Sequence, residues 1–185
     1  MSKSQIKALV FDVFGTVVDW RTSISRQAAE LGTKHGVEAD WNKFADDWRA
    51  GYGVGMAKVN SGEDEWKIVD QIHRERLEVI LDEYGFPSID DAELTEFNKA
   101  WHRLNGWTDS TDGLLRLKSK YIIASLSNGN IALLTNMAKY ANLPWDAVLS
   151  AELTGKYKTH PRAYTKTAEL LGLKYDEVML VAAHN

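Results

Sequence analysis

A short apolar run near the start of the chain constrains the fold most. Residues 8–11 (Ala-Leu-Val-Phe) are apolar without interruption, which is typical of a strand buried on both faces of a parallel sheet. The run ends in Asp12, and Gly15 and Thr16 follow as a turn. Open α/β sheets bind ligands beyond the carboxyl ends of their strands, so the pattern places Asp12 where a site would form. Taken alone, Asp12 could also be a simple turn or helix-capping residue.

A long insertion separates this run from the next one. The second apolar run begins at Tyr121, more than 100 residues later, whereas a strand-helix-strand crossover needs only about a dozen residues. Apolar residues between the two runs recur at spacings of three and four, which predicts helices, with Asp64 and Asp90 as N-caps of two of them. The predicted helices cover residues 22–35, 41–59, 64–84 and 90–105. We therefore expect a helical cap at residues 19–106, inserted into a core domain formed by residues 1–18 and 107–185.

Helices and strands alternate after the insertion. The predicted helices are residues 112–120, 131–141 and 161–171, and the predicted strands are residues 121–126, 147–150 and 178–182. This alternation predicts the α/β class, with a doubly wound parallel sheet of Rossmann-like type. The sequence stops directly after the last predicted strand, where a covering helix is expected. We therefore expect that the C-terminal part of the core is missing from this chain.

Composition excludes several classes of function. The net charge of −4 is spread over interspersed charges, so we expect neither a nucleic-acid partner nor a membrane partner. The chain has no cysteine, which excludes disulfides and thiolate chemistry and fits a cytoplasmic protein. His35, His73 and His102 have no partner at a metal-binding spacing, so we expect them on helix surfaces and predict no metal site. Six of the seven tryptophans precede residue 110, and they could pack helices together or line a pocket.

Three short patterns would meet at one edge of the predicted sheet. Asp12 ends the first strand, Ser127 ends the next within Leu-Ser-Asn-Gly, and Lys158 stands just before a later helix. This combination resembles the haloacid dehalogenase superfamily, whose motifs are an aspartate nucleophile followed by a Gly-Thr turn, a serine or threonine after a strand, and a lysine before a helix. The resemblance extends from Lys7 to the last residue and implies the fold of that superfamily, with its helical cap at the insertion.

Differences from the phosphatases of that superfamily indicate the branch. Those enzymes carry a second aspartate two residues after the nucleophile and an aspartate that holds Mg²⁺ after the last strand, where this chain has Phe14 and Ala183. The motifs instead resemble the L-2-haloacid dehalogenases, the (S)-2-haloacid dehalogenase type, and Arg49 after Trp48 matches their cap arginine. Thr159 replaces the usual proline after the motif lysine. The family's further aspartate would lie about two positions beyond Asn185.

The resemblance implies hydrolysis of short-chain 2-haloalkanoic acids to 2-hydroxy acids, without metal or other cofactor, through an aspartyl ester. It assigns catalytic roles to Asp12 as nucleophile, to Lys158, which would keep that carboxylate ionised, and to Thr16 and Ser127. The substrate- and halide-binding residues that it implies, or that surround these motifs, are Phe14, Arg49, Asn128, Tyr164 and His184. Lys158 could polarise the ester, with His184 or the further aspartate positioning water.

Other interpretations stay open at this point. A phosphatase acting on a small phosphorylated metabolite and a catalytically silent binding domain are the alternative functions. Arg49 could be a solvated helix residue, Thr16 and Ser127 could be turn and cap residues, and Tyr164 could belong to the core or to the site wall. The dehalogenases that this chain resembles are commonly dimers, so a homodimer is also expected.

Overall fold

The computed structural model describes residues 5–183, so His184 lies outside the described residues. Within them, four parallel strands form one sheet in the order β5-β4-β1-β6, as expected for a doubly wound α/β core. The first, β1 (Ala8–Phe11), lies between β4 and β6 and is buried along its whole length, as its unbroken apolar sequence predicts. The other elements are β2 (Val18–Asp19), α1 (Trp20–His35), α2 (Trp41–Ser61), α3 (Val69–Glu83), α4 (Asp91–Asn98), η1 (Lys99–His102), β3 (Asn105–Gly106), α5 (Ser110–Lys118), β4 (Ile122–Ser127), α6 (Ile131–Tyr140), β5 (Ala147–Ser150), η2 (Ala151–Leu153), α7 (Pro161–Leu170), η3 (Tyr175–Glu177) and β6 (Val178–Val181).

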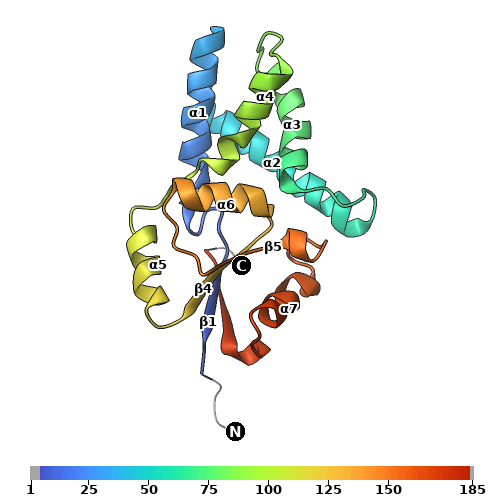
Figure 1. The fold of residues 1–185 in the computed structure, drawn as a ribbon. Helices are drawn as coiled ribbons and strands as arrows, with labels where there is room; N and C mark the ends of the chain where they lie inside the picture. The colour runs from blue at the N-terminus through green and yellow to red at the C-terminus, as the bar shows by residue number, and fades with distance from the viewer. Residues whose placement is uncertain (1–4, 184–185) are drawn as a thin grey trace.

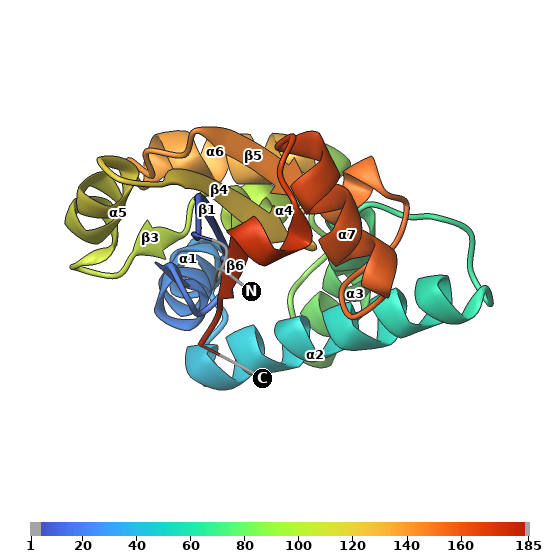
Figure 2. The ribbon, with the colours of Figure 1, turned by 90° about the horizontal axis from the view of Figure 1, so that it is seen from below.

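The two faces of the sheet are covered by different helices. Leu9 and Phe11 pack in one apolar cluster with α5 and α6, whereas Val10 belongs to a second cluster that includes Leu126 and residues of and near α7. Alternate residues of a strand point to opposite faces, so these clusters define a three-layer core. Figure 2 shows α5 and α7 on opposite sides of the strands.

Helices α1–α4 together with η1 form a layer that we call the cap. Figure 1 shows it at one end of the molecule, beyond the carboxyl ends of the strands. The chain passes from core to cap through β2 and returns through β3, and these two short strands pair antiparallel. The two chain segments that connect core and cap therefore lie side by side.

Two of the predicted cap helices have different bounds in the structure. The helix expected from Asp64 begins only at Val69, because Asp64 instead accepts a hydrogen bond from the Lys67 ammonium at 3.0 Å and the chain stays irregular up to Ile68. The helix expected over residues 90–105 ends as α4 at Asn98 and continues as η1, and Asn105 lies in β3. Asp90 is an N-cap as predicted, since its side chain accepts the Glu93 N–H at 2.8 Å.

The expectation that the histidines lie on helix surfaces is wrong. His73 is fully buried and its ring stacks on that of Trp101, with 4.2 Å between the centroids. His102 is also buried, and its Nε2 lies 3.0 Å from Asp70 Oδ1. His35 is partly buried against Glu93. The helical period alone did not separate the buried from the exposed face here, because histidine is compatible with both.

The burial of His73 predicts a loss of stability in mild acid. Burial, reinforced by the charges of Arg49 and His102, holds the pKa of His73 well below its ordinary value. The unfolded chain binds a proton on this ring below about pH 6.5, while the folded chain does not. The free energy of unfolding should therefore be greatest above that pH and fall as the pH is lowered, by up to about 1.4 kcal/mol per pH unit for one proton.

Urea unfolding between pH 7.5 and 5.5 measures this slope. His73→Phe should flatten it, since a phenyl ring keeps the stack on Trp101 but takes no proton. The unchanged protein, measured at the same pH values, is the reference. An equal slope in the unchanged protein and in His73→Phe would show that the acid sensitivity has another source.

Candidate active site

The carboxylate of Asp12 is held at both of its oxygens. Thr16 Oγ1 donates a hydrogen bond to Asp12 Oδ2 at 2.8 Å, and Lys158 Nζ donates to Oδ1 at 2.7 Å. Thr16 can reach back because the chain turns sharply at Gly15, whose φ of 86° is a conformation that favours glycine. The Asp12 N–H is also fixed, since it donates to Val181 O of the neighbouring strand at 2.9 Å. The carboxylate therefore stands in one orientation at the carboxyl edge of the sheet.

Lys158 is fixed by the core at its backbone and at its ammonium group. Its Nζ donates to Leu126 O at 2.9 Å as well as to Asp12, and its backbone N donates to Asn128 Oδ1 at 2.7 Å. The side chains of Lys158 and Asp12 are only 14% and 17% exposed. Water screens such a pair less than it screens a surface pair, so the ammonium offsets the negative charge of Asp12 strongly.

Ser127 and Asn128 lie at the end of the neighbouring strand, as predicted. Ser127 is buried, and its Oγ accepts a hydrogen bond from Gly129 N at 3.2 Å, which is the turn-forming role left open by the sequence. Its O–H can still donate to a substrate. Asn128 contacts the cap as well as its own layer, because Nδ2 lies 3.1 Å from Met56 Sδ in the cap and Oδ1 accepts a hydrogen bond from the backbone N–H of Lys158.

Arg49 points inward from α2 and is not a solvated helix residue. Its Cζ lies 3.9 Å from the ring centroid of Tyr52 and 5.3 Å from that of Phe14, the apolar residue two positions after Asp12. Its Nη1 is buried and has no hydrogen-bond partner within residues 5–183. A buried donor without a partner costs free energy, so this N–H is suited to an anionic ligand.

Sequence reasoning missed Tyr52 and Met56. Both follow Arg49 on α2 at helical spacing and so lie on the same inward face, which was the signal that could have found them. Tyr52 is buried, and burial raises the pKa of its hydroxyl even though the nearby positive charge of Arg49 acts against that shift. The hydroxyl therefore stays protonated and can donate a hydrogen bond near Asn128.

The structure does not bring Tyr164 to this cluster. Tyr164 lies against Val10, Leu126 and Ala168 on the face of the sheet covered by α7, so the core interpretation describes its position. His184, also predicted for the site, lies outside the described residues.

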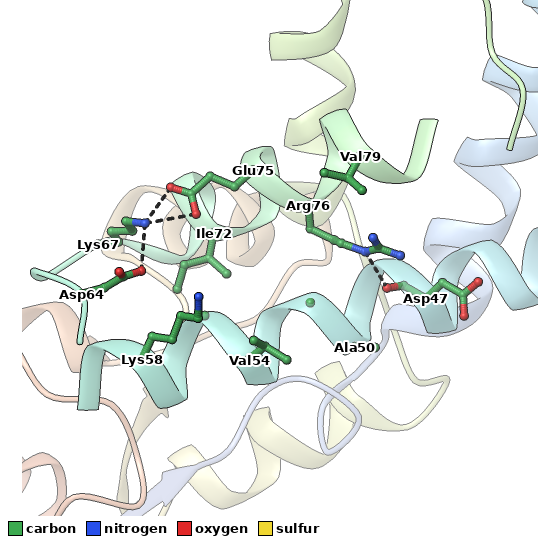
Figure 3. Close-up of a pocket in the computed structure, with 12 residues that line it drawn as sticks. Asp47, Ala50, Val54, Lys58, Asp64, Lys67, Ile72, Glu75, Arg76 and Val79 are labelled. Carbon is green, nitrogen blue, oxygen red and sulfur yellow. Dashed lines mark hydrogen bonds and ion pairs between the residues drawn. The ribbon is translucent and has the colours of Figure 1, made fainter. Parts of the chain in front are cut away.

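A wide groove between α2 and α3 is separate from the Asp12 cluster. It has a volume of about 730 Å³, and Figure 3 shows Val54 and Val79 on its apolar part and Asp47, Arg76 and Lys67 near its ends. None of the predicted site residues lines it. The chemistry-bearing groups thus lie between cap and sheet, whereas this groove lies within the cap.

The Asp12 cluster offers a magnesium ion a single carboxylate, that of Asp12. Each of its oxygens accepts one hydrogen bond, from Thr16 or Lys158, and the ammonium of Lys158 already supplies a positive charge beside it. Phe14 offers no oxygen ligand. In the described part of the chain no group of three or more His, Cys, Asp or Glu side chains is placed to hold a metal.

The class of protein that these features define is a capped α/β hydrolase. The features are an aspartate and a lysine fixed at the carboxyl edge of a parallel sheet and a helical cap with an inward arginine. The sequence pattern of haloacid dehalogenase-like hydrolases matches residues 6–181, and the chain belongs to that family. The protein is similar to (S)-2-haloacid dehalogenase 4A of Burkholderia cepacia, with 30% identity over 97% of this chain and 75% of that one.

Solved structures agree in fold over nearly the whole chain. The crystal structure of the defluorinating L-2-haloacid dehalogenase Rha0230 has a TM-score of 0.94 and 47% identity, covering 97% of this chain and 74% of that one. The L-2-haloacid dehalogenase from Xanthobacter autotrophicus with chloropropionic acid covalently bound has a TM-score of 0.81 and 26% identity, covering 95% and 69%. The α/β fold predicted for this family is therefore confirmed.

Proposed function

We propose that this protein is a hydrolase that removes halide from short 2-haloalkanoic acids and releases 2-hydroxy acids. The observation that carries the proposal is the Asp12 carboxylate, which Lys158 holds at 2.7 Å. Phe14, two residues after Asp12, packs against the guanidinium of Arg49, whose Nη1 is buried without a partner among residues 5–183. The relatives named as (S)-2-haloacid dehalogenases support the same reaction and the (S) enantiomer. We place no metal or cofactor in the reaction.

In the first step, Asp12 attacks C2 of the substrate from the side opposite the halogen. The new bond joins a carboxylate oxygen to C2, the carbon–halogen bond breaks, and halide leaves with inversion at C2. Thr16 and Lys158 orient the carboxylate for this attack. Halide needs no proton to leave, which fits Phe14 at the position where a general acid would stand in a phosphatase.

We assign the departing halide to Arg49 and Asn128. The buried Nη1 of Arg49 and the amide of Asn128 are N–H donors beside the apolar wall made by Phe14. Donors already in place stabilise a charge that develops in the transition state without further reorganisation. We assign the substrate carboxylate to Ser127 and Lys158. The O–H of Ser127 can donate a hydrogen bond to this anionic group, and the ammonium of Lys158 adds a positive charge.

In the second step, water attacks the carboxyl carbon of the Asp12 ester. The C–O bond at that carbon breaks, so the 2-hydroxy acid leaves with an oxygen that came from Asp12, and the oxygen of water replaces it. One proton of the water goes to the departing hydroxyl oxygen, and the other is released as Asp12 becomes a carboxylate again. Lys158 polarises the ester carbonyl. The covalently bound chloropropionic acid in the Xanthobacter relative supports a covalent route of this kind.

The direct test is halide release from L-2-chloropropionate. We expect release that persists in EDTA and yields D-lactate, the inverted product. Magnesium-dependent phosphate release from para-nitrophenyl phosphate, without halide, would instead identify a phosphatase. If haloacids raised the melting temperature with neither activity, the protein would be a binding domain, since a ligand that binds only the native state stabilises it.

We further propose that residues 19–106 form the cap domain and that residues 1–18 and 107–185 form the core domain. The paired β2 and β3 support this boundary, since both chain crossings lie there and could act as a hinge that gates access to Asp12. A homodimer and a cytoplasmic location are part of the proposal, the latter supported by the cysteine-free sequence. No helix among residues 5–183 has the length and apolar character needed to cross a bilayer.

A further inference from the structure

Tyr157 is a loop residue that is nonetheless fully buried. Its backbone O accepts the N–H of His160 in the core at 2.9 Å, while its hydroxyl, its ring and its backbone N–H contact the cap. Its hydroxyl donates a hydrogen bond to Lys67 O, and its ring stacks on that of Trp66 with 4.7 Å between the centroids. Its backbone N–H donates to Asn60 Oδ1 at 3.2 Å. These cap partners lie in the last turn of α2 and in the chain between α2 and α3, a stretch that we call the 60–67 segment.

The residue directly after Tyr157 is Lys158. Its ammonium reaches Asp12 and its backbone N–H reaches Asn128. Lys158 is therefore held on one side by the core and on the other side, one peptide away, by the cap. Neighbouring Cα atoms are about 3.8 Å apart, so a shift of Tyr157 is passed almost directly to Lys158.

The 60–67 segment is fixed although it has little regular structure. Gly62 ends α2 with a φ of 82°, in the left-handed region, and turns the chain back. The Lys67 ammonium then bonds Asp64 Oδ2 at 3.0 Å and Glu75 Oε1 at 2.9 Å, as Figure 3 shows at one end of the groove. Those two hydrogen bonds raise the pKa of Lys67. Lys67, whose backbone carbonyl accepts the hydrogen bond of the Tyr157 hydroxyl, is thus also held at its side-chain ammonium.

We propose that Tyr157 is a positioning residue through which the 60–67 segment of the cap sets the place of Lys158 against Asp12. Docking of the cap and assembly of the Asp12–Lys158 pair are then one event, and a cap that lifts away loosens the lysine. The inference rests on the proposed function, because it concerns the Asp12–Lys158 pair that the proposed dehalogenation uses.

A role in packing alone would have a different kinetic consequence. The hydrogen bond from Lys158 to Asp12 is short, so it weakens steeply when the ammonium is displaced. The attraction of the ammonium for a substrate carboxylate falls off much more slowly with distance. A displaced Lys158 should therefore lower kcat and leave KM nearly unchanged, whereas lost packing by itself lowers only the melting temperature.

The experiment compares Tyr157→Phe with Tyr84→Phe in the full chain, using L-2-chloropropionate. Both changes remove one hydroxyl that bonds to the cap, since Tyr84 donates to Asp47 Oδ2 at 2.8 Å, but Tyr84 has no link to Lys158. We expect kcat of Tyr157→Phe to fall about fivefold to tenfold with KM changed by less than about twofold. Tyr84→Phe should keep kcat, with a similar change in melting temperature.

A second variant weakens the contact between Tyr157 and the cap by a change in the cap. Asn60→Ala removes the side chain that bonds the Tyr157 backbone and leaves the core sequence intact. Asn60→Ala should lower kcat in the same way. If Tyr157→Phe does not fold, the kcat of Asn60→Ala tests whether the cap positions Lys158. Unchanged kcat in both variants, or equal losses in Tyr84→Phe, would overturn the inference while wild-type halide release upholds the proposed function. Lack of halide release by the wild-type protein would overturn both.

Discussion

Asp12→Asn is expected to lower halide release by about 10⁴-fold or more, the largest effect of any single change in this chain. The neutral amide is nearly isosteric with the carboxylate and can still bond Thr16, but it cannot attack C2 as an anion. The loss should therefore appear in chemistry and not in folding. Steady-state halide release and a thermal melt of the same sample measure both.

An isotope experiment tests the same step without a variant. In a single turnover with H₂¹⁸O, the label should enter the carboxylate of Asp12, and the 2-hydroxy acid should carry none, because its new oxygen comes from the enzyme. Mass spectrometry of the peptide that contains Asp12 reads this out. Label in the product after one turnover would mean that water attacks C2 directly.

Asp109→Asn is the matched control for the first variant. Asp109 is exposed and precedes α5 without a side-chain capping bond, so the same chemical change should leave activity and stability within measurement error. Comparable losses in both variants would point to a general effect of lost charge and not to a nucleophile.

Lys158→Met is expected to lower kcat/KM by about 10²- to 10⁴-fold, with kcat lowered and KM raised. Methionine keeps the length of the side chain but removes the charge that faces Asp12 at 2.7 Å and that we assign to the substrate carboxylate. Each lost bond to a charged group is worth about 1.5–3 kcal/mol, and both are lost together. The full kinetic curve with L-2-chloropropionate measures the two parameters separately.

Lys156→Met provides the control for this change. Lys156 lies two residues earlier in the same loop, and its ammonium is not among the contacts made to Asp12. Its replacement should change kcat/KM by less than about twofold. Activity of Lys158→Met within threefold of the wild type would remove Lys158 from the mechanism and leave Asp12 without its proposed partner.

Several hydrogen bonds between cap and core fall on the loops that carry the proposed catalytic groups. The 60–67 segment holds Tyr157 next to Lys158, and Asp70 of α3 exchanges hydrogen bonds with Asn130, two residues after Asn128. Both loops also meet each other through Asn128 and Lys158. Cap closure should therefore affect chemistry as well as access.

The sequence by itself determined the sheet and the Asp12–Lys158 pair. An unbroken apolar run must be buried on both faces, and parallel strands bring their carboxyl ends to one edge, so residues far apart in sequence met where predicted. That Asp12 and Lys158 lie at the same edge of the sheet followed from local patterns of that kind, together with a family resemblance that the matched sequence pattern confirms.

Only the tertiary structure decided how the cap is packed. Three features depend on segments that come together only when the helices pack. They are the burial of His73 against Trp101, the start of α3 at Val69, and the hydrogen bond from the Tyr157 hydroxyl to the cap. Helical periodicity states which residues share a face, but a histidine or tyrosine suits a buried or an exposed face nearly equally. The choice is made by the neighbouring side chains that fill the same space, and a local pattern holds no information about them.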